Sequence, residues 1–269
     1  MKININFLTS RANQLRDFIL DFIFPIECLG CGCDGAWLCK KCFRKLKFKT
    51  APYCLHCKKE NEFGQFCPAC QPQYALDGVW IAGIYEEQII AKLIKNLKYR
   101  FIYDIAEYLG EFLILFLRDL INKSRISKAD LISGVDQRKF ERVSGHPNTL
   151  LNFRQNLIIP VPLSNKRKCW RGFNQAEIIA SVIADYFKLD LSVDGLIRVK
   201  HKKPQAKLGE AGRKNNIIGC FAWQGRGLAG RNVILVDDVV TTGSTLNECA
   251  KVLKDNEAGE VWGLVVAKG

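Results

Sequence analysis

Two adjacent carboxylates and a short run of hydroxyl residues follow the most strand-like stretch of this chain. The stretch 232–238 predicts a buried strand that ends in Asp237 and Asp238. At the carboxyl edge of a parallel sheet, such carboxylates can accept hydrogen bonds from ribose hydroxyls. The turn that follows offers hydroxyls and backbone amides to a phosphate, and a helix predicted from about 244 to 256 adds the favourable charge of its N-terminus. The candidate phosphate-binding residues of the turn are Thr241, Thr242, Gly243, Ser244 and Thr245.

The turn differs from the two best-known phosphate loops. It has neither the Gly-Lys-Ser/Thr of a Walker A motif nor the Gly-x-Gly-x-x-Gly of a dinucleotide loop. Two acids followed by Thr-Thr-Gly-Ser-Thr resemble instead the signature with which type I phosphoribosyltransferases bind phosphoribosyl pyrophosphate (PRPP). An ordinary strand–turn–helix with capping hydroxyls is the alternative. The resemblance implies that Asp237 and Asp238 contact the ribose as catalytic residues.

Cysteines are the second group that predicts chemistry. Of the 12 cysteines, nine lie between Cys28 and Cys70, and eight of these form four Cys-x-x-Cys pairs. Two such pairs supply the four thiolates of a tetrahedral zinc site, so we expect two structural zinc ions, with an iron–sulfur cluster as the competing interpretation. We favour pairing in chain order, although spacing alone leaves a cross-braced arrangement open, and we interpret Cys33 as a spare or substitute. The predicted ligands are Cys28, Cys31, Cys39 and Cys42 for one ion and Cys54, Cys57, Cys67 and Cys70 for the other.

Basic residues surround these cysteines. The net charge is +13, and residues 40–59 contain eight Lys or Arg and no acid. Aromatic side chains are interleaved with them, which favours binding of single-stranded nucleic acid. A solvated basic surface, with aromatic rings closing a small core, is the alternative. The interleaved rings are Phe43, Phe48, Tyr53 and His56.

The order of predicted elements indicates an α/β fold with a parallel sheet flanked by helices. We divide the chain into an amphipathic helix within 1–25, a double zinc ribbon over 26–72, and a phosphoribosyltransferase-like domain over 77–269. A polar, weakly periodic stretch at about 123–156 predicts a flexible insertion. The predicted strands are 77–85, 157–162, 194–200, 217–223, 232–238 and 260–268, and the predicted helices of the domain are two within 86–121, one over 175–187 and one over 244–256.

Apolar runs are short, and thiols are abundant. No run reaches the roughly 18 residues of a membrane span, and the first residues lack the pattern of a secretory signal. Metal-bound thiolates favour a reducing compartment, so we expect a cytoplasmic protein.

Three further motifs resemble the ComF family of competence-associated proteins. They are the runs 159–177, which contains Arg-Gly-Phe-Asn-Gln, 202–221 and 234–250, and the segment Leu-Ile-Lys-Asn-Leu-Lys-Tyr-Arg (93–100) also fits. The resemblance implies a pyrophosphate loop after the strand 157–162 that meets PRPP and its Mg²⁺, and a mobile loop at 200–215. The candidates are Lys166, Arg167, Lys168 and Arg171 in the first loop and Lys203, Gln205 and Arg213 in the second, with a less specific role for Asn174 or Gln175.

The family implies a function in DNA uptake during natural transformation, with single-stranded DNA as a ligand and a competence helicase or another DNA-processing protein as a partner. An active phosphoribosyltransferase on an unknown nitrogen acceptor is the alternative. The sequence shows no hood that would identify a nucleobase.

Overall fold

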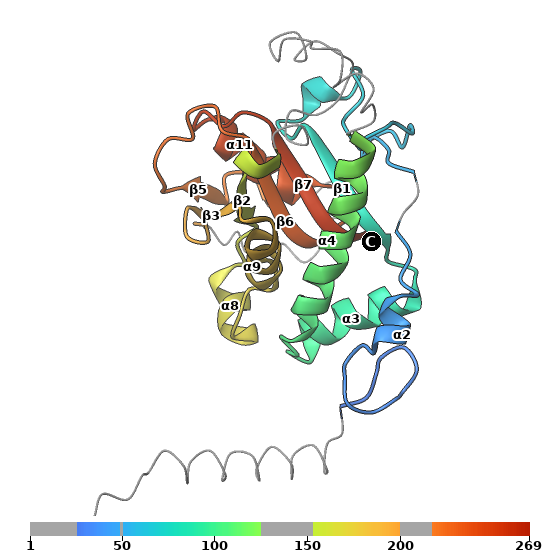
Figure 1. The fold of residues 1–269 in the computed structure, drawn as a ribbon. Helices are drawn as coiled ribbons and strands as arrows, with labels where there is room; N and C mark the ends of the chain where they lie inside the picture. The colour runs from blue at the N-terminus through green and yellow to red at the C-terminus, as the bar shows by residue number, and fades with distance from the viewer. Residues whose placement is uncertain (1–25, 49–50, 125–152, 200–216) are drawn as a thin grey trace, which may run out of the picture. The chain divides into compact units, whose positions relative to one another are not determined.

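The computed structural model describes residues 26–48, 51–124, 153–199 and 217–269 (Figure 1). The predicted N-terminal helix, most of the predicted insertion and the predicted mobile-loop residues Lys203, Gln205 and Arg213 lie outside these ranges. The chain divides into two compact units, Met1–Leu46 and Lys47–Gly269. This division falls inside the predicted zinc ribbon over 26–72, so the two cysteine groups belong to different units.

The described part of the first unit is small. Helix α2 (Lys40–Phe43) follows two backbone turns, in which the Gly32 amide donates to the Cys28 carbonyl at 2.8 Å and the Cys28 amide donates to the Cys33 carbonyl at 2.8 Å. Its buried hydrophobic residues are Cys28, Leu38 and Cys42. So few buried side chains cannot supply a core, which is typical of a unit that a metal holds together.

A five-stranded sheet forms the centre of the second unit (Figure 1). Its order is β1-β7-β6-β2-β3, and every neighbouring pair is parallel. Most residues of the four longer strands are buried on both faces, as near-continuous runs of Val, Ile and Leu predict. The strands are β1 (Gly78–Ile84), β2 (Leu157–Pro160), β3 (Asp190–Leu191), β6 (Val233–Val240) and β7 (Val261–Lys268).

Helices cover both faces of this sheet. On one face α4 (Ile105–Ser124) contacts β1, β7 and α9 (Gln175–Phe187), and α3 (Gln88–Tyr99) packs on α4. On the other face α11 (Ser244–Lys254) packs on β7. Helix α8 (Asn165–Arg171) and two short 3₁₀ helices, η1 (Gln71–Gln73) and η2 (Phe153–Gln155), are the other helices in the described part of the unit. Within the described residues, no helix is long and apolar enough to cross a membrane.

The second cysteine group is part of the core on the α11 face. Residues from this segment pack with β1, β6, β7 and α11 in one buried cluster. The Asn247 side chain of α11 strengthens the contact by accepting hydrogen bonds from the amides of Ala75 at 2.8 Å and Leu76 at 3.3 Å. The residues that the cysteine segment contributes are Tyr53, Cys54, Leu55, Phe66, Cys70 and Leu76.

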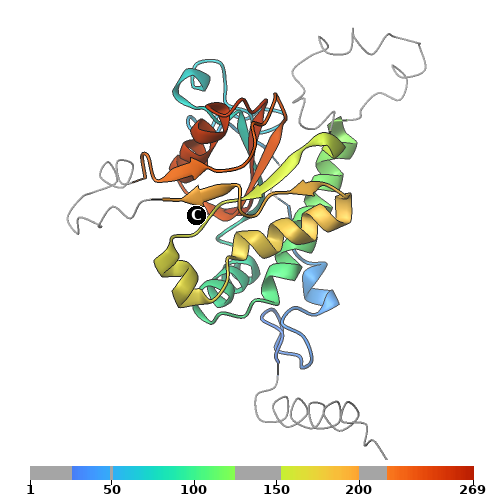
Figure 2. The ribbon, with the colours of Figure 1, turned by 90° about the vertical axis from the view of Figure 1, so that its left-hand side faces the viewer.

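Two strands stand apart from the parallel sheet. The stretches 194–200 and 217–223 were predicted as members of one alternating α/β pattern, but β4 (Leu196–Arg198) and β5 (Phe221–Trp223) pair with each other, antiparallel (Figure 2). Along the chain, β4 precedes residues 200–216 and β5 follows them. Antiparallel pairing allows a local connection, whereas a parallel pair needs a long crossover.

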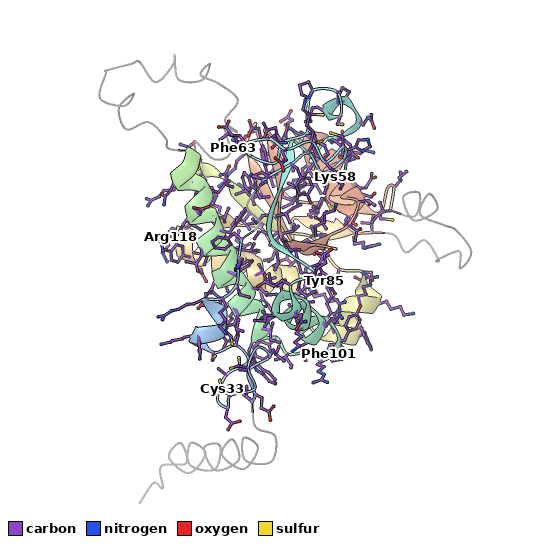
Figure 3. The ribbon with its side chains drawn as sticks, turned by 90° about the vertical axis from the view of Figure 1, so that its right-hand side faces the viewer. Cys33, Lys58, Phe63, Tyr85, Phe101 and Arg118 are labelled. Carbon is purple, nitrogen blue, oxygen red and sulfur yellow. The ribbon has the colours of Figure 1, made fainter. Side chains whose placement is uncertain are left out.

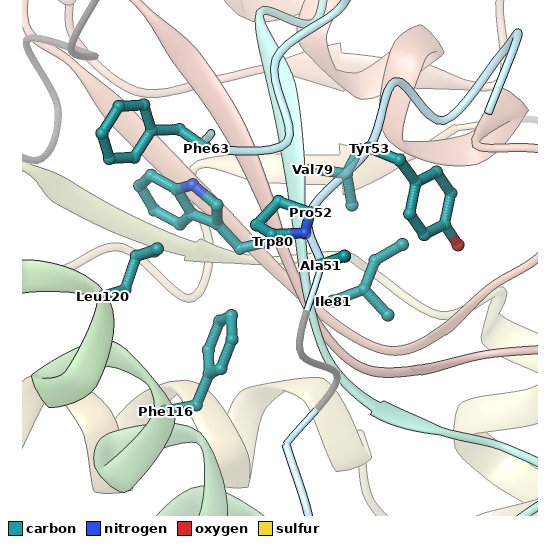
Figure 4. A pocket seen from close by; sticks show the side chains of 9 residues that line it. All are labelled: Ala51, Pro52, Tyr53, Phe63, Val79, Trp80, Ile81, Phe116 and Leu120. Carbon is teal, nitrogen blue, oxygen red and sulfur yellow. The ribbon is translucent and has the colours of Figure 1, made fainter. Parts of the chain in front are cut away.

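One small cavity lies between β1 and α4. It has a volume of about 20 Å³, and Figure 4 shows Phe63, Trp80, Phe116 and Leu120 among its lining side chains. This volume is close to that of a single water, and the lining is mostly apolar. The cavity is therefore a packing gap rather than a binding site.

Candidate functional site

A large cleft opens at the carboxyl ends of the central strands. Its volume is about 970 Å³, and the end of β6 brings Asp237 and Asp238 to it. Helices α3, α8 and α11 and strand β4 contribute the other walls. The lining side chains with polar or aromatic groups are Lys98, Tyr99, Ser164, Lys166, Arg167, Trp170, Arg171, Gln175, Arg198, Asp237, Asp238 and Thr245.

The two carboxylates differ in their partners. Asp238 is almost completely buried, and its Oδ1 pairs with the Lys98 ammonium at 2.9 Å. Asp237 Oδ1 accepts a hydrogen bond from the Asp238 amide at 2.8 Å. Burial and the charge of Asp238 raise the pKa of Asp237 to about 8. At neutral pH the pair therefore holds one proton that a ligand rich in hydroxyls or a cation would displace.

The predicted phosphate turn is well ordered. Gly243 adopts φ +78°, a left-handed conformation that favours glycine, and it is the N-cap of α11. The hydroxyls of Thr242 and Ser244 lie 2.8 Å apart, and Thr245 lines the cleft. A Cβ atom at Gly243 would approach Leu55 Cδ2 at 2.6 Å. The turn therefore lies directly against the second cysteine segment.

The exchange Gly243→Ala tests this contact. We expect a loss of about 1–3 kcal/mol in the free energy of unfolding beyond the cost of the left-handed backbone, because Leu55 must move. Gly230→Ala is the matched control, since Gly230 has φ +76° and no atom within 4 Å of its Cβ position. Urea unfolding measures both variants, and Leu55→Ala should reduce the difference between them. Equal destabilisation by the two exchanges would contradict the contact.

The predicted pyrophosphate loop is in fact partly helical. Helix α8 (Asn165–Arg171) begins at Ser164, whose hydroxyl accepts from the Arg167 amide at 3.3 Å, and ends at Gly172 with φ +79°. Lys166, Arg167 and Arg171 line the cleft as predicted, whereas Lys168 is not among the lining residues. The helix was missed because its basic composition hides any apolar period.

Arg171 is the most constrained cation of the cleft. It is 9% exposed, and its Nη1 donates to Gln175 Oε1 at 2.9 Å. Burial lowers the pKa of Arg171, although the negative charge of Asp238 acts to raise it. Asn174 does not reach the cleft, because its side chain caps α9 by accepting from the Ala176 amide at 3.2 Å and donates to the Val161 carbonyl at 3.2 Å. Gln175 thus orients a cation, and Asn174 has a structural role.

Several lining residues were not predicted as site residues. Neither Lys98 nor Arg198 was singled out from the sequence. Tyr99 and Trp170 also line the cleft. Lys98 lies in the family-like segment 93–100, which was the available signal, and no sequence pattern pointed to Arg198.

Three polar atoms of this cleft share an unusual property. Asp238 Oδ2, Arg171 Nε and Arg198 Nε are buried and find no hydrogen-bond partner within the described residues. A buried polar atom without a partner costs about 1–3 kcal/mol, so such atoms seldom gather without a reason. All three residues line the same cleft. One carboxylate acceptor and two guanidinium donors fit a ligand that offers both hydroxyls and anionic oxygens.

Two groups of four thiols could each hold a metal. In the second unit the sulfur atoms of Cys54, Cys57, Cys67 and Cys70 lie within 4.8 Å of one another, with 3.6 Å between those of Cys57 and Cys67. Zinc bonds of about 2.3 Å in a tetrahedron place sulfurs about 3.8 Å apart. Although burial opposes it, backbone amides beginning with that of Cys57 lower the pKa of Cys54 to about 7. The group therefore fits zinc, and its four thiols come from two Cys-x-x-Cys pairs that follow each other in the chain.

The group in the first unit contains a fifth thiol. The sulfurs of Cys28, Cys31, Cys33 and Cys39 lie within 4.8 Å of one another, so Cys33, labelled in Figure 3, joins three of the predicted ligands, whereas the fourth, Cys42, is not within 4.8 Å of all of them. The thiols of Cys31 and Cys39 raise the pKa of Cys33 to about 12. Burial and the same two thiols raise the pKa of Cys42 to about 12. Four of these five thiols fill a zinc shell, which fits the first ribbon.

The predicted nucleic-acid surface of the cysteine-rich segment is divided between the two units. Two of its aromatic rings are also used for packing. Phe48 lies 5.1 Å from the Phe112 ring and 5.8 Å from the Phe116 ring, and Tyr53 is buried in the core. The exposed His56 approaches the Tyr74 hydroxyl at 2.8 Å. For Phe48 and Tyr53, the alternative interpretation therefore applies, in which aromatic rings pack in a core instead of stacking on bases.

Comparison with known proteins agrees with these features. The family models for a double zinc ribbon domain and a phosphoribosyl transferase domain match residues 19–71 and 171–268. Competence protein F of Haemophilus influenzae is 31% identical over 86% of this chain and 90% of its own length. Competence protein ComFC of Bacillus subtilis is 27% identical over 80% of this chain and 77% of its own.

Two matches are more limited. DNA utilization protein YhgH of Escherichia coli strain K12 is 34% identical over 39% of this chain and 47% of its own length. A hypoxanthine phosphoribosyltransferase structure from Staphylococcus aureus aligns with 45% of this chain and 58% of its own, at 14% identity and a TM-score of 0.28. The fold assignment accordingly rests on the sheet and the family models. The parallel sheet with its flanking helices, the two groups of four cysteines and the full-length likeness together show that the chain belongs to the ComF family, with a double zinc ribbon and a type I phosphoribosyltransferase fold.

Proposed function

We propose that this chain binds PRPP with Mg²⁺ in the cleft and acts in DNA uptake during natural transformation, where it binds single-stranded DNA. The observation that carries PRPP binding is the set of three buried polar atoms without partners, on Asp238, Arg171 and Arg198, beside the hydroxyl-rich turn. PRPP has ribose hydroxyls for the carboxylates, a pyrophosphate for the guanidinium groups and a 5′-phosphate for the turn. The names of the competence and DNA-utilization relatives support the biological part.

Each wall of the cleft has a distinct role in this proposal. Asp237 and Asp238 accept hydrogen bonds from the ribose hydroxyls, and the backbone amides at the start of α11 hold the 5′-phosphate. The cations of the lining, Lys166, Arg167, Arg171 and Arg198, meet the pyrophosphate. Lys98 neutralises Asp238 at 2.9 Å and is displaced toward the pyrophosphate when the ribose takes its place. Bound Mg²⁺ would further neutralise the pyrophosphate.

A calorimetric titration with PRPP and Mg²⁺ tests the proposal. Asp237→Ala and Asp238→Ala should weaken binding about tenfold or more, because each removes a charged hydrogen-bond acceptor from a buried site. Asp255→Asn is the control, since Asp255 is exposed beyond the far end of α11. If the wild type binds no PRPP, or if both cleft variants bind like the control, the proposal fails.

A phosphoribosyltransferase on a nitrogen acceptor is the second candidate. The cleft of about 970 Å³ leaves room for an acceptor beside PRPP. In that reaction the bond from C1 to pyrophosphate breaks as the nitrogen attacks, and the chain positions the reactants and stabilises charge. Release of pyrophosphate from PRPP in the presence of candidate bases, and its loss in Asp238→Ala, would distinguish an enzyme from a binding protein.

The proposal also assigns the ligands of two zinc ions and the cellular compartment of the protein. We assign Cys28, Cys31, Cys39 and Cys42 to one structural zinc, with Cys33 adjoining, and Cys54, Cys57, Cys67 and Cys70 to the other. Thiolate sites of this kind persist in a reducing compartment, so we place the protein in the cytoplasm. A competence helicase or another DNA-processing protein is its proposed partner.

A further inference from the structure

The mouth of the cleft has two large aromatic side chains that are open to solvent. Trp170 is 58% exposed and Tyr99 is 63% exposed, although both line the cleft that contains Asp237 and Asp238. Scattered exposed aromatics need no explanation, but two that converge on one polar cleft do. Tryptophan and tyrosine have large flat faces and few rotatable bonds, so they bind flat ligands at a low entropic cost.

The two rings are held by separate elements. Tyr99 is the last residue of α3, and Trp170 lies in α8. Phe101 braces Trp170, because the two ring centroids lie 5.0 Å apart at an interplanar angle of 88°. Phe101, labelled in Figure 3, adopts φ +60°, which is uncommon for a bulky residue. The loop between α3 and α4 thus accepts a strained conformation that places its ring against the tryptophan.

Cations surround the aromatic pair. Lys98, Lys166 and Arg167 line the same cleft. Two further cations are exposed: Arg100, which follows Tyr99 in the chain, and Lys168, which lies two residues before Trp170. Asp237 and Asp238 are the acids among the lining residues of the described chain, and Lys98 neutralises one of them. Arg100 and Lys168 lie outside the cleft lining that is assigned to PRPP. A free nucleobase carries no charge for these two cations, whereas a nucleic-acid strand supplies a phosphate with each base.

We propose that Tyr99 and Trp170 form a stacking site for a base of single-stranded DNA, whose phosphates are bound by the exposed cations Arg100 and Lys168 outside the cleft lining. The inference rests on the proposed DNA binding and adds the place where the strand is held. Basic residues with aromatic stacking platforms are the usual composition of single-strand binding surfaces. In the cysteine-rich segment, by contrast, the rings of Phe48 and Tyr53 pack inside the unit.

Fluorescence anisotropy with a labelled oligothymidine measures the proposal. Trp170→Ala should weaken binding by roughly 5- to 150-fold, as expected for one stacked base, and Trp170→Phe should restore most of it. Tyr186→Ala is the matched control, because Tyr186 is 51% exposed and lies outside the cleft lining. It should bind like the wild type.

A second oligonucleotide separates stacking from charge. An abasic strand of the same length keeps its phosphates, so its affinity should be the same for Trp170→Ala and the wild type. Binding of the normal oligonucleotide should also quench tryptophan emission in the wild type and less in Trp170→Phe, since Trp170 is the most exposed tryptophan among the described residues.

The outcomes distinguish this inference from the proposed function. If the wild type does not bind the oligonucleotide at all, the proposed DNA binding fails, and the stacking site fails with it. If the wild type binds the oligonucleotide and both Trp170→Ala and Tyr99→Ala bind it as tightly as the wild type does, only the stacking site is overturned. A loss in Trp170→Ala that is as large for the abasic strand would show a general loss of the surface, and would also overturn it.

Discussion

Replacement of Cys67 by serine is expected to release one zinc ion per chain and to lower the melting temperature of the unit Lys47–Gly269 by about 10 °C or more. Cys54, Leu55 and Phe66 of this cysteine segment belong to the same buried cluster as α11 and the central strands. Structural zinc contributes on the order of 10 kcal/mol to small metal-dependent folds. Even a few kcal/mol correspond to such a shift, at about 2–4 °C per kcal/mol for a unit of this size.

The double exchange of Cys31→Ser and Cys33→Ser is the matched control. Both thiols belong to the unit Met1–Leu46, and because only three of its five thiols then remain, the exchange removes the other zinc and should leave the main melting transition in place. Differential scanning calorimetry together with zinc analysis measures both variants. An unchanged transition in Cys67→Ser after loss of its zinc would show that the metal is unnecessary for the core of the larger unit.

Asp237→Asn is expected to raise the stability of the ligand-free protein at pH 8 while it abolishes PRPP binding. Burial and Asp238 raise the pKa of Asp237 to about 8, against a value of about 4 in the unfolded chain. The folded state therefore binds the proton more tightly, and the stability that the neutral acid contributes is lost as the pH rises from about 4 to about 8. Asparagine resembles the neutral acid at every pH. The gain is on the order of a few kcal/mol, since one pKa unit equals about 1.4 kcal/mol.

Melting temperatures between pH 4 and pH 9 check this result. The wild type should lose stability relative to Asp237→Asn up to about pH 8, and the two curves should approach each other toward pH 4. Asp255→Asn controls for the change in net charge, because this exposed acid lies away from Asp238. Parallel curves for the wild type and Asp237→Asn would contradict the raised pKa. By the same linkage, PRPP with Mg²⁺ should bind more tightly as the pH approaches 8, because it favours the ionised pair.

The phosphate half of the site could be predicted from sequence because its signals are local. The apolar run before Asp237 specifies a buried strand, and Gly243 with its flanking hydroxyls specifies the turn. Helix α9 was predicted with both its ends, since Asn174 caps it and its apolar residues repeat at helical spacing. The PRPP contacts assigned to these residues remain predictions.

The cationic half depended on long-range contacts. Lys98 reaches Asp238 from a helix far away in the chain, and helical periodicity shows only that Lys98 is not a core residue. Arg198 lies on a strand whose partner, β5, is antiparallel, and short apolar runs do not specify the direction of pairing. Similarly, the spacing of the cysteines identified the two thiol groups, but it did not show to which unit each group belongs.

The contact of Leu55 with Gly243, and the hydrogen bonds from Ala75 and Leu76 to Asn247, place a metal knuckle on the helix that begins at the phosphate turn. Thermodynamic linkage makes this contact reciprocal. If the knuckle favours the conformation of the turn that receives a phosphate, an occupied turn must raise the affinity of the knuckle for zinc by the same factor. A chain that has lost this zinc would then bind the proposed ribose phosphate more weakly, so that a metal site with no part in the chemistry would still set the affinity of the cleft.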